Sequence, residues 1–409
     1  MEAVLKILLL TQWFDPEPTF KGLVFAQKLQ AEGHEVEVIT GFPNYPGGQI
    51  YAGYKQRWLQ RESINGIRVN RVPLYPSHDG SGIKRAFNYI SFAITSCLFG
   101  LFMAKKAQVI YAYHPPLTVG MSAVFIGFFR RIPVVYDIQD MWPDTLKATG
   151  MLNNKKALKL VSSICQWIYR RAAALVVLSP GFKQLLLERG VPAHKVSVIY
   201  NWCDASVLTQ PQTTNKLPIP MENHFNVVFA GTMGKAQALD SVLQAAAIVQ
   251  NTNTNVRFVF VGGGVEITHL KKLAQELLLD NIVFIPRMPM DEVGQVLASA
   301  DVLLVHLRND PLFEITVPSK TQAYMAVGKP ILMAVSGDAA NLVEQADCGL
   351  SVQAENETAI ADAVLKLASM PHDVLFAMGQ RGKSYYQDKL SLDVGVKKFI
   401  NVFETVKKQ

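Results

Sequence analysis

Short apolar runs and longer helical segments alternate along this chain of 409 residues. The apolar runs are dense in Val, Ile and Leu, and segments with helical patterning separate them. They read KILLLT, EVEVIT, AQVIYAY, PVVYDI and ALVVLS, and later FNVVFAG, VRFVFVG, NIVFIP, ADVLLVHL, PILMAV and GLSV. Strands of this composition are buried on both faces, so the pattern predicts an α/β fold built from doubly wound parallel sheets with helices on both sides.

The chain is too long for one ordinary hydrophobic core, and the alternation lapses at one place. Residues 206–222 are polar and contain several prolines, which is typical of a linker. We therefore predict a Rossmann-like domain over residues 1–205 and a second one over residues 223–389. A final amphipathic helix over residues 390–409 is expected to cross back to the first domain.

Cysteine usage and the first residues bound the class of protein. The four cysteines are scattered, with no close pair and no CxxC, so neither a disulfide framework nor a zinc site is indicated. The first residues lack the basic start, the long apolar run and the cleavage site of a secretory signal. We expect a cytoplasmic protein.

Positive charge is concentrated in the first half of the chain. The whole chain carries a net charge of +7, whereas residues 1–205 hold 23 Lys and Arg against 13 Asp and Glu. This balance favours a polyanionic or phosphate-bearing partner, and a solvated basic face is the alternative.

Residues 86–104 form a largely apolar segment with basic pairs at both ends. A membrane span is one interpretation, but its polar residues and its place between two strands favour a buried or half-buried helix. The basic ends of this segment, together with Phe125 and Phe128–Arg131, predict peripheral contact of the protein with anionic lipid at the inner face of the plasma membrane.

In open α/β sheets, ligands bind beyond the carboxyl ends of the strands. The loop Thr11–Gly22 has no GxGxxG, which counts against a dinucleotide fold, and it offers aromatic residues and one cation instead. The loop 41–48 again combines aromatic and turn residues. Such loops suit stacking on sugar faces, whereas ordinary turn chemistry explains only their Pro and Gly. The side chains that these loops and the loop after PVVYDI offer to a sugar are Trp13, Phe14, Lys21, Asn44, Tyr45 and Trp142.

Three carboxylates, Asp137, Asp140 and Asp144, cluster after the run PVVYDI. Carboxylates at a strand end can supply a base, an orienting group or a hydrogen-bond acceptor for sugar hydroxyls. Asp144 follows a proline where a helix starts, so capping explains it better. His114 holds the corresponding place after AQVIYAY, where a structural and a functional role have similar weight.

The second half of the chain contains a candidate anion-binding site. Glycines follow two strands in FAGTMGKAQ and FVGGGVE, and glycine lets a backbone approach a phosphate or ribose closely. After ADVLLVHL, a loop leads into a helix at Pro318, which suits the first helical turn. Ser319 and Lys320 then place a hydroxyl and a cation beside the positive end of the helix. This arrangement is a good binding site for a pyrophosphate.

These motifs, in order, resemble a known family. WFDPEP, GHEVEVITGFPNYPGG, DIQDMWPD, VIYNW, FAGTMGKAQALDSVL, VGGGVE and VPSKTQAYMAVGKPIL are similar to the large GT-B family of retaining glycosyltransferases (family 4). The branch that builds bacterial surface polysaccharides is the most similar, and the resemblance covers nearly the whole chain. It implies two Rossmann-like domains facing a cleft, the nucleotide-sugar mainly on the second and the acceptor mainly on the first. It also implies that no metal is required.

By position, the resemblance implies roles for individual residues. The donor site would comprise Gly231, Thr232, Met233, Gly234, Lys235, Gly262, Gly263, Arg287, Met288, Thr316, Val317, Pro318, Ser319 and Gln322. Asp140 would lie near the reacting anomeric carbon, and the catalytic set would be Asp140, His114, Lys320 and Glu314. The sugar-binding loops of the first domain would hold the acceptor. The partners implied are a nucleotide-sugar, by resemblance a UDP-hexose, and a glycan or lipid-pyrophosphate-linked acceptor, with no cofactor and no nucleic acid.

The chain departs from the family pattern at two places. Many relatives carry an Arg after the first glycine and a Lys five residues later, where this chain has Thr232 and Gln237. The family also shows two glutamates with seven residues between them. Here Glu314 and Gln322 have that spacing one residue earlier, so the second glutamate is missing or replaced by Gln322. We expect Lys320 and the nearby Lys235 to carry more of the phosphate charge.

We expect transfer with retention, in which the leaving diphosphate takes the proton of the acceptor hydroxyl and the protein supplies electrostatic stabilisation. Two alternatives stay open. A UDP-sugar epimerase of the same fold would bind the same donor but needs acid and base groups around the sugar. A noncatalytic protein that binds sugar nucleotides or glycans would keep affinity without turnover.

Overall fold

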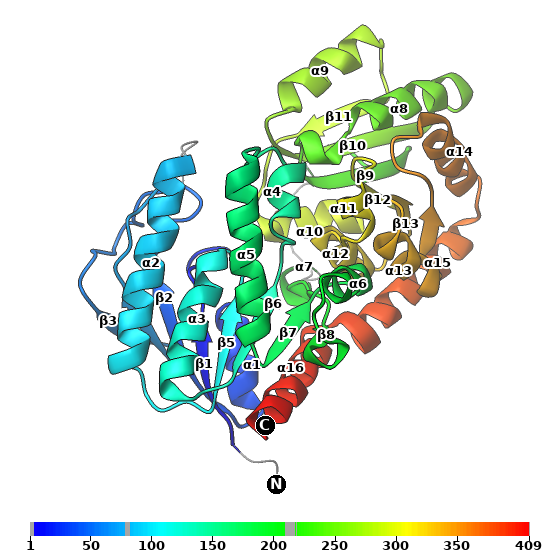
Figure 1. The fold of residues 1–409 in the computed structure, drawn as a ribbon. Coiled ribbons are helices and arrows are strands. Elements are labelled where there is room, and N and C mark those ends of the chain that lie inside the picture. Colours follow the sequence, from blue (N-terminus) through cyan, green and yellow to red (C-terminus); the bar gives the residue numbers. More distant parts are fainter. Residues whose placement is uncertain (1–3, 78–81, 209–216, 218, 409) are drawn as a thin grey trace. The chain divides into compact units, whose positions relative to one another are not determined.

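The computed structural model describes residues 4–77, 82–208, 217 and 219–408, which form two compact units (Figure 1). The first unit contains Met1–Tyr200 and Gly395–Gln409, and the second contains Asn201–Val394. The unit boundary therefore falls five residues before the end of the predicted first domain. Residues 209–216 and 218 of the predicted linker lie outside the described residues.

The first unit is built on a sheet of eight strands in the order β3-β4-β2-β1-β5-β6-β7-β8. The strands are β1 (Lys6–Leu10), β2 (Glu35–Gly41), β3 (Gln60–Ile64), β4 (Ile67–Val72), β5 (Val109–Tyr113), β6 (Val134–Ile138), β7 (Ala174–Val177) and β8 (Val196–Val198). All neighbours pair in parallel except β3, which pairs antiparallel with β4. This hairpin is not among the predicted strands, and its turn is Asn65-Gly66 with positive φ at both residues.

Helices follow most strands of the first unit. They are α1 (Leu23–Ala31), α2 (Gly82–Phe102), α3 (Leu117–Arg130), α4 (Asp144–Ala148), α5 (Lys155–Arg171) and α6 (Pro180–Glu188). Local chemistry sets several ends: Asn154 caps α5, and Ser179 caps α6 with Pro180 in its first turn. The last helix, α16 (Leu392–Lys407), packs Phe399 on the rings of Phe25 and Tyr111 in the first unit.

Helix α2 meets the criteria of length and composition for a membrane span, and it alone does so among the described residues. Its inner face, with Phe92 and Phe99, is buried. Gly100 lies so close to α3 that an added Cβ would be 2.4 Å from an Ile126 methyl group. Only 28% of the most apolar stretch of α2 is buried inside the protein, however. The helix is thus buried on one face and exposed on the other.

The second unit contains a fully parallel sheet of six strands in the order β11-β10-β9-β12-β13-β14. The strands are β9 (Phe225–Thr232), β10 (Val256–Gly263), β11 (Ile282–Ile285), β12 (Val302–His306), β13 (Ile331–Ala334) and β14 (Gly349–Ser351). The helices are α7 (Ala205–Leu208), α8 (Asp240–Thr252), α9 (Ile267–Glu276), α10 (Met290–Ala298), α11 (Pro311–Glu314), α12 (Ser319–Val327), α13 (Asp338–Gln345), α14 (Glu357–Ala368) and α15 (His372–Tyr385).

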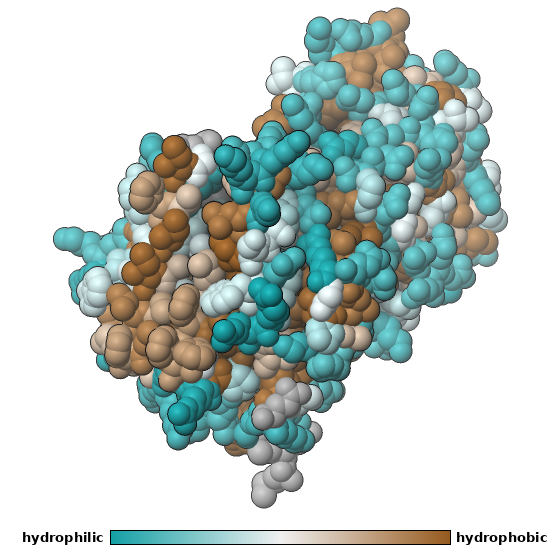
Figure 2. All heavy atoms as spheres, in the orientation of Figure 1, coloured by the Kyte–Doolittle hydropathy of each residue, from teal (hydrophilic) through white to brown (hydrophobic). Residues whose placement is uncertain are grey.

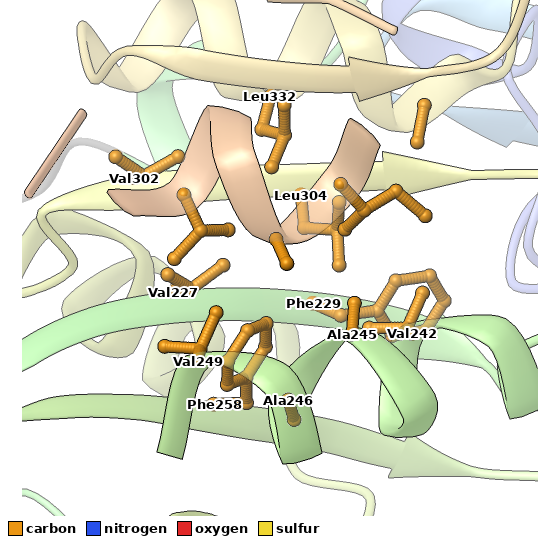
Figure 3. Packing of buried hydrophobic residues seen from close by; sticks show 14 of the residues in the cluster. Val227, Phe229, Val242, Ala245, Ala246, Val249, Phe258, Val302, Leu304 and Leu332 are labelled. Atoms are coloured by element: carbon orange, nitrogen blue, oxygen red, sulfur yellow. The ribbon is translucent and has the colours of Figure 1, made fainter. Parts of the chain in front are cut away.

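The core of the second unit lies between this sheet and helices α8 and α14. Figure 3 shows Val227 and Phe229 of β9, with Phe258 of β10, packed against Val242 and Val249 of α8. All five side chains are almost completely buried. This packing makes a rigid support, from which the loops after β9, β10 and β12 project at one edge of the sheet.

Candidate functional site

Two glycine-bearing loops meet at the carboxyl ends of β9 and β10. Gly231 and Gly262 are register partners, and a Cβ added at Gly262 would lie 2.1 Å from the Gly231 carbonyl oxygen. The Met233 N–H donates to the Gly263 carbonyl oxygen at 2.8 Å, which joins the loops backbone to backbone. Gly231 is exposed and has a φ of 143°. It therefore presents bare backbone to which a phosphate or ribose can approach closely.

The start of α12 lies against the end of β9. The Tyr324 hydroxyl links the two elements, because it accepts from the Ala230 N–H at 2.9 Å and lies 3.3 Å from the Ala230 carbonyl oxygen. As a result, Lys320 Nζ lies 3.1 Å from the position that a Gly231 Cβ would occupy. The helix start, the exposed Ser319 and the Lys320 ammonium together favour an anion beside Gly231.

Lys320 is a partly buried cation. Its Nζ lies 3.6 Å from the centroid of the Phe229 ring, and no carboxylate pairs with it among the residues that the structure describes. Burial lowers the pKa of Lys320 from 10.5 to about 7. An approaching diphosphate would supply the negative charge that the surrounding protein does not, and would raise this pKa again.

His306, which the sequence analysis did not single out, fixes the loop that carries Lys235. Its Nδ1 lies 2.6 Å from the Gln237 carbonyl oxygen, and its Nε2 accepts from the Glu355 N–H at 3.1 Å. These partners require a neutral ring with the proton on Nδ1, and burial lowers the pKa of His306 accordingly. A polar residue at the end of the apolar run ADVLLVHL was the available sequence signal.

Most of the remaining predicted donor residues, and Glu314 of the predicted catalytic set, lie at the same edge of the second sheet, at or after the ends of β9, β10, β11 and β12. The exposed ones are Thr232, Lys235, Arg287, Glu314 and Ser319. The partly exposed ones are Gly234, Gly263, Met288, Thr316 and Pro318. The Thr316 hydroxyl donates to the Leu312 carbonyl oxygen at 2.7 Å, which leaves only its lone pairs for a ligand.

The structure does not support three of the donor assignments. Met233 is completely buried in the core, and Val317 is 6% exposed, so neither side chain can reach a ligand. Gln322 is 1% exposed, and its amide group lies 3.0 Å from the Pro318 carbonyl oxygen, to which its nitrogen can donate. Gln322 therefore stabilises the start of its own helix instead of replacing a ribose-binding glutamate.

In the first unit, the loops after β1 and β2 are joined by Glu17, another residue that the sequence analysis passed over. Its carboxylate accepts from the backbone N–H groups of Asn44 and Tyr45, both at 2.7 Å, and of Phe14 at 3.3 Å. Burial raises the pKa of Glu17 to about 7, although these hydrogen bonds and Arg71 act in the opposite direction. One side chain thus sets the conformation of both aromatic loops.

Asn88 extends this network to α2. Its side-chain nitrogen donates to Asn44 Oδ1 at 3.3 Å and to the Tyr75 carbonyl oxygen at 2.7 Å, and its Oδ1 accepts from Gln12. Asn44, assigned to a sugar by the sequence analysis, is 1% exposed. Its side chain therefore acts within the loop. Trp13 and Tyr45 remain partly exposed, and their rings stack with centroids 4.5 Å apart.

Phe14 and Lys21 also turn inward. Both have no exposed surface, so the structure does not support their assignment to an acceptor. Lys21 Nζ donates to Asp137 Oδ2 at 2.6 Å, and the Tyr111 hydroxyl donates to the same oxygen. Burial of a cation is costly unless it is paired, and this ion pair satisfies that requirement inside the unit. Asp137 is equally buried and belongs to the same structural network.

Asp140, His114 and Trp142 follow the neighbouring strands β5 and β6. The His114 and Trp142 rings meet edge to face at 5.3 Å, and Trp142 is partly exposed. Burial lowers the pKa of His114 to about 3, so its ring is neutral, and its Nδ1 has no hydrogen-bond partner within the described ranges. Asp140 is partly exposed, and burial raises its pKa to about 6. Asp144 pairs with Arg189, which together with its helix start makes it structural.

Comparison with known sequences identifies both halves of the chain. Residues 23–202 match the family model "Glycosyl transferase 4-like domain", and residues 211–385 match "Glycosyl transferases group 1". WcaI of Escherichia coli, named as a colanic acid biosynthesis glycosyl transferase, is 27% identical over 79% of this chain and 82% of its own length. The glycosyltransferase WbjE of Pseudomonas aeruginosa is 26% identical over 72% of this chain and 74% of its own length.

Solved structures agree on the fold. The Anabaena protein HepE in complex with UDP superposes with a TM-score of 0.71 at 15% identity, over 98% of this chain and all of its own. A sucrose-phosphate synthase from Thermosynechococcus elongatus gives a TM-score of 0.70 at 15% identity, over 98% of both chains. The predicted fold class is confirmed. The chain belongs to the glycosyl transferase group 1 family, with an N-terminal glycosyl transferase 4-like domain, and it has the GT-B fold.

Proposed function

We propose that this protein is a retaining glycosyltransferase that moves a hexose from a UDP-sugar to a glycan or lipid-pyrophosphate-linked acceptor in surface polysaccharide synthesis. The observation that carries the proposal is the candidate anion-binding site of the second unit, where Lys320 and the start of α12 lie beside the exposed Gly231. HepE was solved with UDP, and an Escherichia coli neighbour was solved with UDP-2-fluoro glucose. The name of WcaI supports a polysaccharide product.

In the proposed reaction, the bond between the anomeric carbon and the diphosphate oxygen breaks, and a bond to the acceptor oxygen forms on the same face of the sugar. The proton of the acceptor hydroxyl passes to the leaving diphosphate. Lys320, Lys235 and the start of α12 stabilise the charge that develops on the diphosphate. This step needs neither a metal nor a further cofactor.

The first unit would hold the acceptor, and its exposed residues narrow the contacts. The stacked pair Trp13 and Tyr45 and the partly exposed Trp142 offer aromatic faces to a sugar. Asp140 offers a carboxylate that is ionised above about pH 6, and it would stabilise positive charge at the anomeric carbon. His114 contributes at most a neutral hydrogen-bonding group.

The test is a screen of UDP-, GDP- and dTDP-hexoses with purified enzyme and a lipid-pyrophosphate-linked sugar as acceptor. The product's anomeric configuration is then determined by NMR. The proposal expects transfer from a UDP-hexose with the donor's α configuration kept. Transfer with a β-linked product would refute retention. Epimerised sugar without transfer would identify an epimerase instead, and tight UDP binding without turnover would identify a noncatalytic binding protein.

A further inference from the structure

Exposed apolar side chains run along one side of α2 and continue onto the end of α3. On α2 they recur every three or four residues, which places them on one face of the helix. This apolar face comprises Ile83, Phe87, Ile90, Ile94, Leu98 and Phe102 of α2 with Phe125, Phe128 and Phe129 of α3. Phe102 is 81% exposed, and Phe128 and Phe129 are 64% and 66% exposed. Figure 2 shows the resulting hydrophobic patch over α2 and the adjoining part of α3.

This face is exposed because the opposite side of α2 is fixed to the protein. Phe92 and Phe99 are buried, Gly100 lies tightly against Ile126, and the Thr95 hydroxyl donates to the Pro73 carbonyl oxygen at 2.7 Å. With this packing, α2 cannot leave the sheet to span a bilayer. It is an amphipathic helix that lies on the surface of the unit.

The helices that carry the apolar face, and α5 beside them, are basic. Residues 82–187 contain thirteen Lys and Arg but only three acidic residues, which are Asp137, Asp140 and Asp144. This segment accounts for the whole positive excess of the first half of the chain. Asp137 is buried in its ion pair with Lys21, and Asp144 pairs with Arg189. The outward charge of α2, α3 and α5 is therefore basic.

Basic and aromatic side chains alternate where α2, α3 and α5 end. Arg130 donates to the carbonyl oxygens of Gly100 and Lys105, and the Arg171 guanidinium lies 5.8 Å from the Phe128 ring centroid. Lys105, Lys106 and Arg131 are exposed beside them. Basic residues at helix ends also interact favourably with the helix dipole, but that effect does not explain the exposed phenylalanines.

We propose that the apolar face inserts into the headgroup region of an anionic lipid bilayer. The phenylalanines reach the boundary of the acyl chains, while Lys105, Lys106 and Arg131 contact lipid phosphates. Self-association through the same face is disfavoured, because two copies would bring the basic ends of α2, α3 and α5 against each other. A bilayer supplies both the apolar interior and the negative charge that this face lacks.

The inference rests on the proposed function for its biological meaning, since it names the surface from which a lipid-linked acceptor would be presented. Asn88, on the inner side of α2, is hydrogen-bonded to the loops proposed to hold that acceptor. Vesicle binding, however, can be measured without any sugar nucleotide. The two proposals can therefore fail separately.

The experiment measures binding of the full chain to vesicles of phosphatidylcholine, with and without phosphatidylglycerol, at 50 mM and 500 mM salt. An apolar variant carries Phe102→Ser, Phe128→Ser and Phe129→Ser. Its matched control carries Leu278→Ser, Val374→Ser and Phe376→Ser, three exposed apolar residues of the second unit that lie outside the glycine loops. UDP binding is measured for each variant as a check of folding.

A charge variant carries Lys105→Gln, Lys106→Gln and Arg131→Gln. Its control removes three exposed lysines of the second unit, Lys272, Lys366 and Lys389. Arg130 is left unchanged, because its guanidinium donates hydrogen bonds to backbone carbonyls.

We expect the wild type to bind anionic vesicles at low salt and to release them at high salt. The apolar variant should bind about tenfold more weakly or worse, and the charge variant about a hundredfold more weakly at low salt, since each basic residue contributes about fivefold. Both controls should bind as the wild type does. The proposal would be overturned if the wild type did not bind anionic vesicles at low salt. It would also be overturned if the apolar variant bound them as strongly as the wild type. A dimer that the apolar variant dissociates would identify a second copy as the partner and would also overturn it. Normal UDP binding in a variant that has lost vesicle binding leaves the proposed function intact.

Discussion

Replacement of Lys320 by Met is expected to stabilise the unliganded protein. Burial shifts the pKa of Lys320 from 10.5 to about 7. A shift of this size corresponds to about 5 kcal/mol against the charged form, at about 1.4 kcal/mol per pKa unit. The side chain is only partly buried and its Nζ faces the Phe229 ring, so we expect a net gain of about 1–2 kcal/mol. Met fills similar space and contacts the ring favourably.

The pH dependence of this gain has a definite sign. The unfolded chain keeps the Lys320 pKa near 10.5, so between pH 7 and pH 10.5 it binds more protons at this site than the folded chain does. The cost of the buried charge is therefore present in full below pH 7 and fades as the pH rises toward 10.5. Urea unfolding at pH 6, 8 and 9.5 should show the variant most stabilised at pH 6. A variant that is less stable than the wild type at pH 6, or a difference independent of pH, would refute this reasoning.

The same substitution should impair donor binding. Loss of one charge-assisted hydrogen bond to a phosphate costs about 1.5–3 kcal/mol, or about tenfold to a hundredfold in affinity. Isothermal titration with UDP measures this loss. Lys235→Met is the matched control, because Lys235 is exposed and its removal should cost less. Equal UDP affinity in Lys320→Met and wild type would remove Lys320 from the donor site.

Three further outcomes test the two sites. Gly262→Ala should lose UDP binding and stability, because its Cβ would lie 2.1 Å from the Gly231 carbonyl oxygen. Gly263→Ala should be tolerated, because a Cβ there meets nothing within 4 Å. Thermal melts and UDP titrations compare the two variants. The kcat/KM of the wild type should fall as the pH drops through about 6, where Asp140 is protonated, and Asp140→Asn should be slow with that limb absent. Activity should survive EDTA, and a loss restored by magnesium or manganese would contradict the metal-free mechanism.

Local sequence signals were sufficient for most of the fold and for the two glycine loops of the second unit. Apolar runs marked the strands, and glycines marked the loops in which Gly231 and Gly262 pack against each other. Pro318 marked the start of the helix that carries Lys320. The hairpin at Asn65-Gly66, which was not predicted, also has a local signal, since this dipeptide is a strong turn signal between two strands.

Side-chain direction within the loops could not be predicted in the same way. Phe14 and Lys21 belong to a loop after a strand, where exposed residues are expected, yet both point inward. The partner of Lys21 is Asp137, which is 116 residues away in sequence. Glu17 and His306 were missed for a related reason, because their roles depend on backbone groups of other loops. Such contacts exist only once the strands are paired, and a single sequence does not reveal them.

Helix α2 has one face bonded to the loops of the first unit and one exposed apolar face, and the proposed lipid contact of the second face has a thermodynamic consequence. Its inner residue Asn88 is bonded to the loops after β1 and β2, while Phe87, the preceding residue, is 60% exposed. If both ligands favour the same arrangement of α2 and these loops, their binding is coupled, and the coupling free energy is the same in both directions. If lipid contact improves the affinity of these loops for an acceptor by some factor, acceptor binding must strengthen the attachment to lipid by that same factor. The enzyme would then reside longest on membranes that already carry its substrate and would leave them as that substrate is consumed.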